Sequence, residues 1–209
     1  MKHIKKNRRT FIKSLLAVSG LSVLPVKAAD KATMKTPRAT EGPFYPLESM
    51  RYADIDNNLV KISGEVKKAG GEVLNLSGRV LDSNAKPIKG ARVEIWQCDV
   101  NGHYLHTADN NPVPLDKAFQ GFGYTVSDQN GVYSFRTIKP VSYPGRTPHI
   151  HVKAFANGRE LTTQFYINGH PENENDFLFG YMSKEQQEAV SMTLKPGKDG
   201  LETVIDIVV

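Results

Sequence analysis

Residues 148–167 of this 209-residue chain read PHIHVKAFANGRELTTQFYI. Two runs rich in β-branched and aromatic residues, 150–155 and 161–167, flank the turn-forming stretch Ala156-Asn157-Gly158-Arg159. This pattern predicts a β-hairpin. Pro148 fits the start of its first strand, where the missing N–H of proline does least harm.

Similar short runs lie on both sides of this hairpin. We expect further strands over residues 73–81, 91–98, 122–127, 132–137, 192–194 and 203–209. Asp128-Gln129-Asn130-Gly131 predicts a second hairpin, and Ser183 with Gln186 predicts one or two capped helical turns over 183–189. Short strands at close spacing are typical of an all-β fold, here a single-domain β-sandwich with long active-site loops.

The order of these segments predicts three regions: an export signal over residues 1–29, an irregular wrapping segment over 30–71, and a β-sandwich catalytic domain over 72–209. In the first region Arg8-Arg9 precede a modestly apolar run that ends near Ala28-Ala29. Paired arginines in this position are typical of a twin-arginine signal, which predicts a periplasmic or secreted protein. An ordinary Sec signal or a basic tail is the alternative. The apolar run is too short to span a bilayer, so no membrane partner is expected.

Charge and cysteine content exclude two other classes of protein. Seven of the 27 basic residues lie in residues 1–29, which hold no acid, so the remaining 20 bases face 22 acids. A mature chain with a net charge of −2 has no overall attraction for nucleic acid. Cys98 is the only cysteine, which excludes an intramolecular disulfide and indicates a small buried residue beside Trp96.

The clearest chemical signal is His149-Ile150-His151. Residues i and i+2 of a strand face the same side, so the two imidazoles converge on one point. A bare His-x-His pattern is also compatible with two histidines on an exposed edge strand.

Two tyrosines strengthen the metal interpretation. Tyr143 lies in a proline-rich loop six residues before His149, and Tyr104 follows the turn Asn101-Gly102. A phenol is almost fully protonated at neutral pH, so it binds only a hard, strongly charged cation. Ferric iron meets this requirement, whereas zinc and copper favour sites richer in His or Cys.

Together these segments resemble the intradiol ring-cleavage dioxygenases, the family of protocatechuate 3,4-dioxygenase and catechol 1,2-dioxygenase, and the protocatechuate β-chain in particular. The resemblance covers residues 41 to 180 in the order of the family. It rests on the stretches 41–45, 90–99, 102–104, 130–140, 146–151 and 161–166.

The resemblance implies four ligands to Fe(3+), namely Tyr104, Tyr143, His149 and His151. It implies that Tyr143 leaves the metal when substrate binds. Arg146 corresponds to the arginine that stabilises charge on the substrate, with a surface cation near a loop as the alternative, and Gln164 corresponds to a glutamine near the pocket. The implied activity inserts both atoms of O2 into a catechol and cleaves the ring between its hydroxylated carbons, giving a muconate-type diacid.

The chain also departs from the family pattern. Only Pro144 to Pro148 separate Tyr143 from His149, and Gly145 replaces an aromatic residue, so substrate specificity stays open. The N-terminal helical dimerisation region of catechol 1,2-dioxygenases is missing, although a homo-oligomer stays open. His103, His106 and His170 are expected as loop or pocket-wall residues, and Trp96 as a core residue.

Two rival functions use the same residues differently. A non-catalytic exported β-sandwich that binds an aromatic or carbohydrate ligand fits the same fold. A metalloenzyme built on His149 and His151 alone, possessing hydrolytic activity, fits the same motif. Colour, iron content and replacement of the tyrosines by phenylalanine separate these alternatives.

Overall fold

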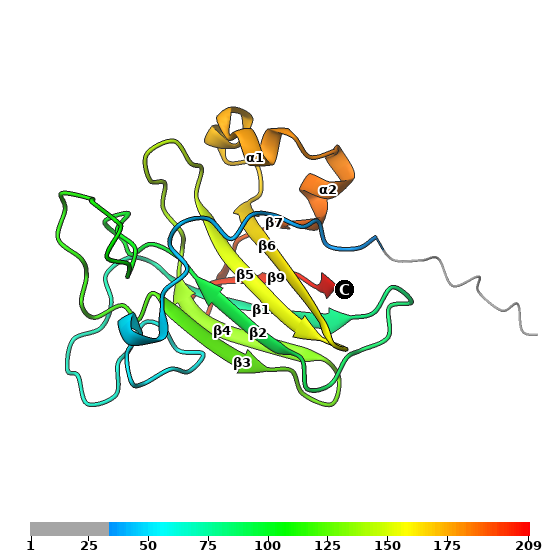
Figure 1. Ribbon diagram of the computed structural model, residues 1–209, viewed down its shortest axis with the longest axis horizontal. Helices are drawn as coiled ribbons and strands as arrows, with labels where there is room; N and C mark the ends of the chain where they lie inside the picture. Colours follow the sequence, from blue (N-terminus) through cyan, green and yellow to red (C-terminus); the bar gives the residue numbers. More distant parts are fainter. Residues whose placement is uncertain (1–33) are drawn as a thin grey trace, which may run out of the picture. The chain divides into compact units, whose positions relative to one another are not determined.

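The computed structural model describes residues 34–209 (Figure 1). The predicted export signal over residues 1–29 lies outside the described residues, as does the beginning of the predicted wrapping segment. The elements are η1 (Glu48–Met50), β1 (Val73–Leu81), β2 (Arg92–Trp96), β3 (Phe122–Val126), β4 (Val132–Ile138), β5 (His149–Ala156), β6 (Arg159–Ile167), η2 (Pro171–Asn175), α1 (Phe177–Gly180), α2 (Lys184–Ala189), β7 (Ser191–Met192), β8 (Lys195–Gly197), β9 (Gly200–Val204) and β10 (Ile207–Val208).

Within residues 34–209 the strands form two five-stranded sheets. The first has the order β10-β1-β9-β8, with β4 paired antiparallel to β1. The second has the order β3-β2-β5-β6-β7, and its centre is the predicted hairpin of β5 and β6. The all-β sandwich expected from the spacing of the strands is therefore confirmed.

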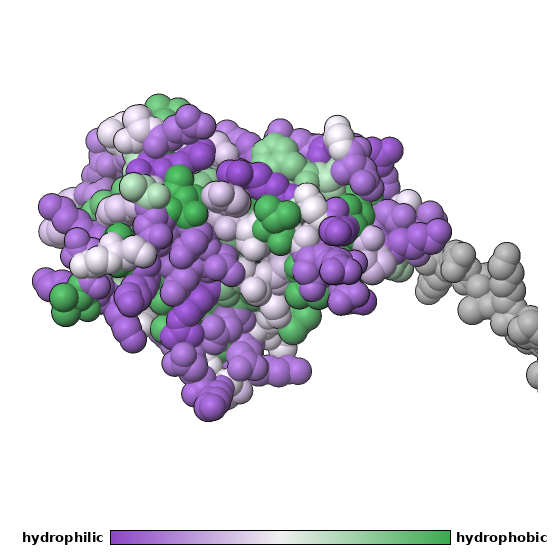
Figure 2. Space-filling view, turned by 90° about the horizontal axis from the view of Figure 1, so that it is seen from below, coloured by the Kyte–Doolittle hydropathy of each residue, from purple (hydrophilic) through white to green (hydrophobic). Residues whose placement is uncertain are grey.

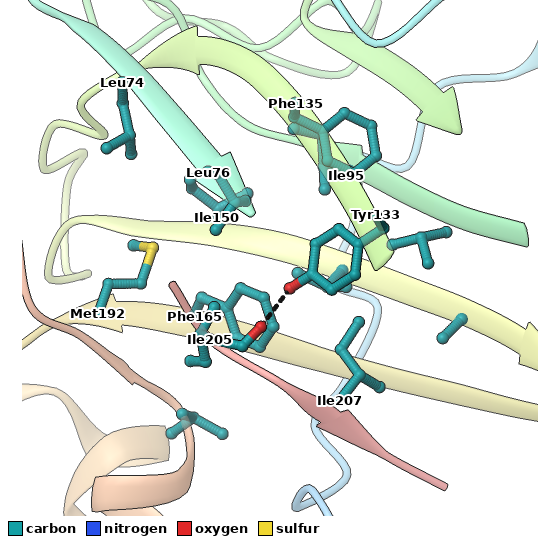
Figure 3. Packing of buried hydrophobic residues seen from close by; sticks show 14 of the residues in the cluster. Leu74, Leu76, Ile95, Tyr133, Phe135, Ile150, Phe165, Met192, Ile205 and Ile207 are labelled. Carbon is teal, nitrogen blue, oxygen red and sulfur yellow. Dashed lines mark hydrogen bonds between the residues drawn. The ribbon is translucent and has the colours of Figure 1, made fainter. Parts of the chain in front are cut away.

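The hydrophobic core lies between the two sheets (Figure 3). Burying one large apolar side chain contributes about 1.5–3 kcal/mol to stability. A polar contact lies within the first sheet, where the Tyr133 hydroxyl on β4 donates a 2.7 Å hydrogen bond to the carbonyl of Ile205, between β9 and β10. The first sheet contributes Leu74, Leu76 and Phe135, and the second contributes Ile95, Ile150 and Phe165.

The second sheet is buried on both faces. One face carries Ile150 and Val152 into the core, while the other carries His149 and His151, and all four side chains are buried. Across the ladder His151 pairs with Trp96 on β2 and with Gln164 on β6. Cross-strand partners share a face, so the sheet itself gathers these three side chains in one row.

The N-terminal segment lies over the face of this sheet that carries His149 and His151. The backbone N–H of Thr36 bonds to the Val208 carbonyl, and that of Ala39 bonds to the Thr162 carbonyl. In Figure 1 this blue segment crosses β5 and β6. The described beginning of this segment thus lies along the sandwich.

The prediction of a hairpin around Asp128–Gly131 is wrong. The turn itself forms, since the N–H of Gly131 bonds to the Asp128 carbonyl. However, β3 pairs with β2 and β4 pairs with β1, so the strands on its two sides enter different sheets. A turn signal fixes a local reversal of the chain but does not determine which strand becomes the partner.

The prediction of one continuous closing strand over residues 203–209 is also wrong, because the chain forms two short strands in this region, β9 and β10. The interruption arises at Gly78 on β1, where an added Cβ would lie 1.7 Å from the Ile205 carbonyl oxygen. The next N–H, of Arg79, bonds to the Asp206 side chain at 2.8 Å, and parallel pairing resumes between Val80 and Ile207. A glycine that admits another backbone at close range accounts for this break.

Of the remaining elements, α2 has the predicted capping box of Ser183 and Gln186. The short elements η1, η2, α1 and β8 were not predicted. Figure 2 shows hydrophobic areas on the face seen from below as small separate patches among hydrophilic ones. In the described range, none of the helices has the length and apolar character that crossing a membrane requires.

Candidate metal centre

Strand β5 begins with the two histidines of the predicted site. Their side chains share one face, and their Nε2 atoms lie 3.1 Å apart. His149 is 1% exposed and His151 is 2% exposed, so both imidazoles are removed from bulk water. The structure therefore places the pair in the interior, and an exposed edge strand, the alternative interpretation, does not apply.

The protonation of these imidazoles suits a metal. His149 Nδ1 lies 2.7 Å from the Thr147 carbonyl, which can only accept, so Nδ1 carries the proton and Nε2 is left with a lone pair. Burial lowers the pKa of His149 to about 4, and the Arg146 guanidinium adds to this shift. Burial together with the neighbouring His149 lowers the pKa of His151 well below 6.5. Both rings are therefore neutral at pH 7.

Tyr104 approaches from the long loop between β2 and β3. Its backbone N–H bonds to the Asp109 carboxylate at 2.7 Å, which fixes the loop at this residue. Its ring centroid lies 5.3 Å from that of Tyr143 and 5.9 Å from that of His151. Phe44 stacks on its outer face at 4.8 Å.

Tyr143 approaches from the loop between β4 and β5. A tight turn, in which the Arg146 N–H bonds to the Tyr143 carbonyl, requires Gly145 to adopt a φ of +82°. The Tyr143 ring centroid lies 5.5 Å from that of His149. The structure therefore brings together all four predicted ligands, which come from β5 and the two loops.

The residues that meet here fit a hard trivalent ion. Among residues 34–209 no group of three or more His, Cys, Asp or Glu residues could hold a metal, and the side chains that lie beside the two histidines are the phenols of Tyr104 and Tyr143. The Tyr104 hydroxyl is buried and has no hydrogen-bond partner among the described residues. Burial raises its pKa well above 10, so a phenolate forms there only beside a strong cation. Burial also raises the pKa of Tyr143, with the Arg146 guanidinium opposing this rise.

Arg146 is held rigidly beside this group. Its Nε donates to Asp176 Oδ2 at 2.8 Å, and its Nη2 donates to Gln164 Oε1 at 2.7 Å. Its Nη1 then lies 3.5 Å from the Tyr143 hydroxyl oxygen. Gln164 is fully buried and also accepts from the Tyr166 hydroxyl, while its amide donates to the Thr40 carbonyl. Arg146 is thus no free surface cation, and Gln164 orients it.

Sequence reasoning missed Asp176, the anchor of this arginine. Its side chain is buried, and it also accepts from the Thr147, Leu178 and Phe179 N–H groups. Burial by itself raises the pKa of Asp176, but the Arg146 bond and these backbone donors hold it below its usual value. Asp176 is the N-cap of α1, and an Asp before an apolar run predicts such a cap. Nothing in the sequence indicates its pairing with a residue 30 positions away.

Aromatic side chains form the inner wall. Trp96, predicted as a core residue, is fully buried but stacks on His151 with ring centroids 4.7 Å apart, so it is part of the site as well. Tyr45 packs edge-on against Trp96 and donates to the buried Glu94 carboxylate at 2.7 Å. The N-terminal segment therefore buttresses the site.

The other histidines of the described chain and the cysteine are not part of the cluster of four rings, which consists of Tyr104, Tyr143, His149 and His151. His103 Nδ1 bonds to the Val113 carbonyl, and His170 caps η2. His106 packs near Phe44 at 6.0 Å. Cys98 is buried in the cluster that contains Trp96, as predicted.

A cavity of about 440 Å³ opens beside the cluster. Tyr143 and Arg146 form its inner wall, and the side chains of η2 form its outer wall. Its lining consists of Ser142, Tyr143, Pro144, Gly145, Arg146, Thr147, Glu172, Asn175 and Asp176. Tyr143 therefore borders a space large enough for a small molecule.

Comparison with known proteins places this arrangement in a family. A family model described as "Dioxygenase" matches residues 40–209. The chain is 37% identical over 146 residues to the protocatechuate 3,4-dioxygenase beta chain of Burkholderia cepacia, covering 66% of this chain and 61% of the relative. It is 32% identical to the catechol 1,2-dioxygenase of Acinetobacter baylyi, covering 69% of this chain and 50% of the relative. The aligned region thus spans about half to three fifths of these curated relatives.

The match to one solved structure covers a larger share of that protein's length than the matches to these relatives do. It is the dioxygenase domain of a dioxygenase carbohydrate-binding protein fusion from Streptomyces sp. SirexAA-E. It is 34% identical, with a TM-score of 0.65, and the match covers 84% of this chain and 98% of that domain. The family match, these relatives and the shared sandwich show that the chain belongs to the intradiol dioxygenases.

Proposed function

We propose that this protein is a ferric intradiol dioxygenase that inserts both atoms of O2 into a catechol and cleaves the ring between its hydroxylated carbons. The observation that supports this proposal most is the convergence of four rings on one buried point. Two neutral imidazoles and two phenols meet there, and one of the phenols has no hydrogen-bond partner among the described residues. Tyr104, Tyr143, His149 and His151 would hold Fe(3+).

When bound, the ferric ion would supply the Lewis acidity that makes a catechol anionic and its ring reactive toward O2. The chain contributes proton transfer. A catechol that binds through both oxygens must release two protons, and Tyr143 is half-buried beside the open cavity. Its phenolate can accept one of these protons, acting first as a ligand and then as a base. Tyr104 is buried on the inner side and cannot exchange as readily.

Arg146 would stabilise negative charge on the substrate. Its guanidinium lies 3.5 Å from the Tyr143 oxygen and is oriented by Asp176 and Gln164. A cation held in place before the reaction needs no reorganisation when charge develops. The Trp96 ring and the N-terminal segment exclude water from the other side of the imidazoles.

Iron content, colour and oxygen uptake test the proposal together. The purified, iron-loaded protein should contain about one iron per chain, absorb visible light as a ferric tyrosinate, and consume O2 with catechol while a muconate-type diacid accumulates. Tyr104→Phe and Tyr143→Phe should remove colour and activity. A colourless protein that cannot be loaded with iron would favour the non-catalytic ligand-binding sandwich. Full activity in both variants would favour an enzyme that uses the histidines alone.

Export is a separate proposal, and it rests on residues outside the described range. Arg8 and Arg9 would direct the chain through the twin-arginine route to the periplasm or the exterior. Replacing both arginines with lysine should retain the protein in the cytoplasm, which fractionation would detect. Equal export of the variant would instead indicate a Sec signal.

A further inference from the structure

Two cavities lie on either side of the Tyr143-Pro144 segment. The larger, of about 440 Å³, is bounded by Arg146, Asp176 and Glu172. The smaller, of about 330 Å³, is bounded by Phe44, Asp109, Asn110, Asn111 and Pro112. Tyr143 borders both. A ring that binds beside this phenol would have these two spaces available for its substituents.

The charges that line these spaces are unequal. The larger cavity has one cation, Arg146, and two carboxylates, Asp176 and Glu172. The smaller cavity has one carboxylate, Asp109, and no cation in its lining. A negative substituent would thus meet a surplus of negative charge on either side.

Arg146 cannot relieve this surplus. Its Nε is ion-paired with Asp176, whose side chain is fully buried, and its Nη2 donates to Gln164. The Arg146 side chain itself is only 11% exposed. The part of the guanidinium that remains free faces the Tyr143 hydroxyl, where the proposed reaction takes place. A carboxylate on the far side of a bound ring would find no cation to pair with.

Glu172 is the uncompensated charge at the mouth of the larger cavity. It lies exposed on η2 and accepts a hydrogen bond from the Ser142 hydroxyl. No cation of the described chain lies within ion-pairing distance of its carboxylate. Because Ser142 precedes Tyr143, this bond holds the negative charge beside the entrance to the phenol.

We propose that Glu172 determines substrate class, so that the enzyme acts on catechols with an uncharged or cationic substituent and rejects those with a carboxylate. This inference rests on the proposed function. It sets the chain apart from the similar beta chain whose name specifies protocatechuate. A carboxylate on a substrate bound in the larger cavity would be repelled by Glu172, and we expect this repulsion to lower its affinity about tenfold. The expected order of preference is cationic, then neutral, then anionic.

Kinetics with three catechols test this order. The iron-loaded protein should show a kcat/KM for 4-methylcatechol at least about tenfold above that for 3,4-dihydroxybenzoate, with 4-(2-aminoethyl)catechol at least equal to 4-methylcatechol. Glu172→Gln should reduce the preference for the neutral over the anionic substrate by about three- to tenfold. Raising the salt concentration should reduce it in the wild type as well.

Glu174→Gln is the matched control. Glu174 lies on the same short helix and loses the same charge, but it does not line the larger cavity. The control should therefore keep the wild-type preference. Equal shifts in Glu172→Gln and Glu174→Gln, or a wild type that prefers 3,4-dihydroxybenzoate, would overturn the inference.

Binding without turnover gives a second readout. Calorimetry on the wild type and on Glu172→Gln, with 4-methylphenol and 4-hydroxybenzoate as unreactive probes, should show the same order of affinity. If catechols are consumed but the anionic probe binds as well as the neutral one, this inference fails and the proposed function stands. If the protein takes up no iron and consumes no catechol, the proposed function fails, while the binding order still tests the charge at residue 172.

Discussion

The two faces of strand β5 have different roles. Ile150 and Val152 point into the core between the sheets, whereas His149 and His151 point to the other side, and all four are fully or almost fully buried. The core face is completed by residues from other strands. The site face is completed by loops that bring Tyr104 and Tyr143. The fold thus uses the alternation of one strand to separate stability from chemistry.

The largest effect should come from the site face. We expect His151→Gln to lower iron content to near zero and kcat/KM for catechol by more than about a thousandfold, because one neutral imidazole donor is lost. His170→Gln is the matched control, since His170 caps η2 and its ring contacts the Thr147 hydroxyl and is not one of the four predicted ligands. Atomic absorption and oxygen uptake measure both effects. Retention of iron by the His151 variant would contradict the assigned ligand set.

The neighbouring residue on the core face should give the opposite profile. Ile150→Ala should reduce the free energy of unfolding by about 2–5 kcal/mol, because it leaves a cavity among packed side chains. The folded fraction should still bind about one iron per chain. Urea denaturation measures stability, and Val204→Ala, at a position that is 74% exposed, is the control that should change it little. If Ile150→Ala lost its iron while keeping the stability of the wild type, the two faces of β5 would not have separate roles.

Positioning of Arg146 should have an intermediate effect. Asp176→Asn removes the charge that holds the guanidinium, and we expect kcat/KM to fall about 10- to 100-fold, mainly through kcat. The same substitution at Asp206, which pairs with the half-exposed Arg79 on the first sheet, should leave activity unchanged. Steady-state kinetics with catechol separate kcat from KM. An unchanged kcat in Asp176→Asn would show that Arg146 needs no anchor.

The buried imidazoles should make the stability of the metal-free protein depend on pH. The pKa of His149 is lowered in the folded protein from 6.5 to about 4, so only the unfolded chain binds this proton between those values. Stability should therefore be highest above pH 6.5 and should fall as the pH drops toward 4, by up to about 1.4 kcal/mol per pH unit for this residue. Urea titrations at pH 7 and pH 5 measure the fall. His149→Gln should reduce it, and an equal fall in that variant would assign it to other groups.

The smallest effect should come from a polar contact within the first sheet. Tyr133→Phe removes the hydrogen bond to the Ile205 carbonyl and should reduce the free energy of unfolding by about 1 kcal/mol, with iron content unchanged. Denaturation of the variant beside the wild type gives this difference. A loss as large as that of Ile150→Ala would show that this bond within the first sheet contributes as much to stability as the packing of a large apolar side chain.

The two faces also differ in how far the sequence predicts them. Alternation of apolar residues identifies β1, β2, β5 and β6 and the core residues they carry. The His149 and His151 pair follows from the same alternation. The pairing of β3 and β4 does not, because the turn at Asp128–Gly131 is compatible with strands in one sheet or in two.

The parts of the site that were not predictable depend on contacts between distant segments. Trp96 has the pattern of a core residue, and only the register between β2 and β5 places it on His151. Asp176 has the pattern of a helix cap, and only the fold brings it to Arg146. Tyr104 and Tyr143 were candidates because of their positions in the sequence and the chemistry of a phenol, whereas the likeness to a known family supplied their assignment as ligands and the role of Arg146.

Anomalous diffraction from a crystal of the iron-loaded protein tests the central claim most directly. We predict one iron peak inside the cluster of four rings, within coordination distance of the hydroxyl oxygens of Tyr104 and Tyr143 and of the Nε2 atoms of His149 and His151. A peak bound by the two imidazoles with both phenols turned away, or a peak elsewhere on the protein, would contradict the account.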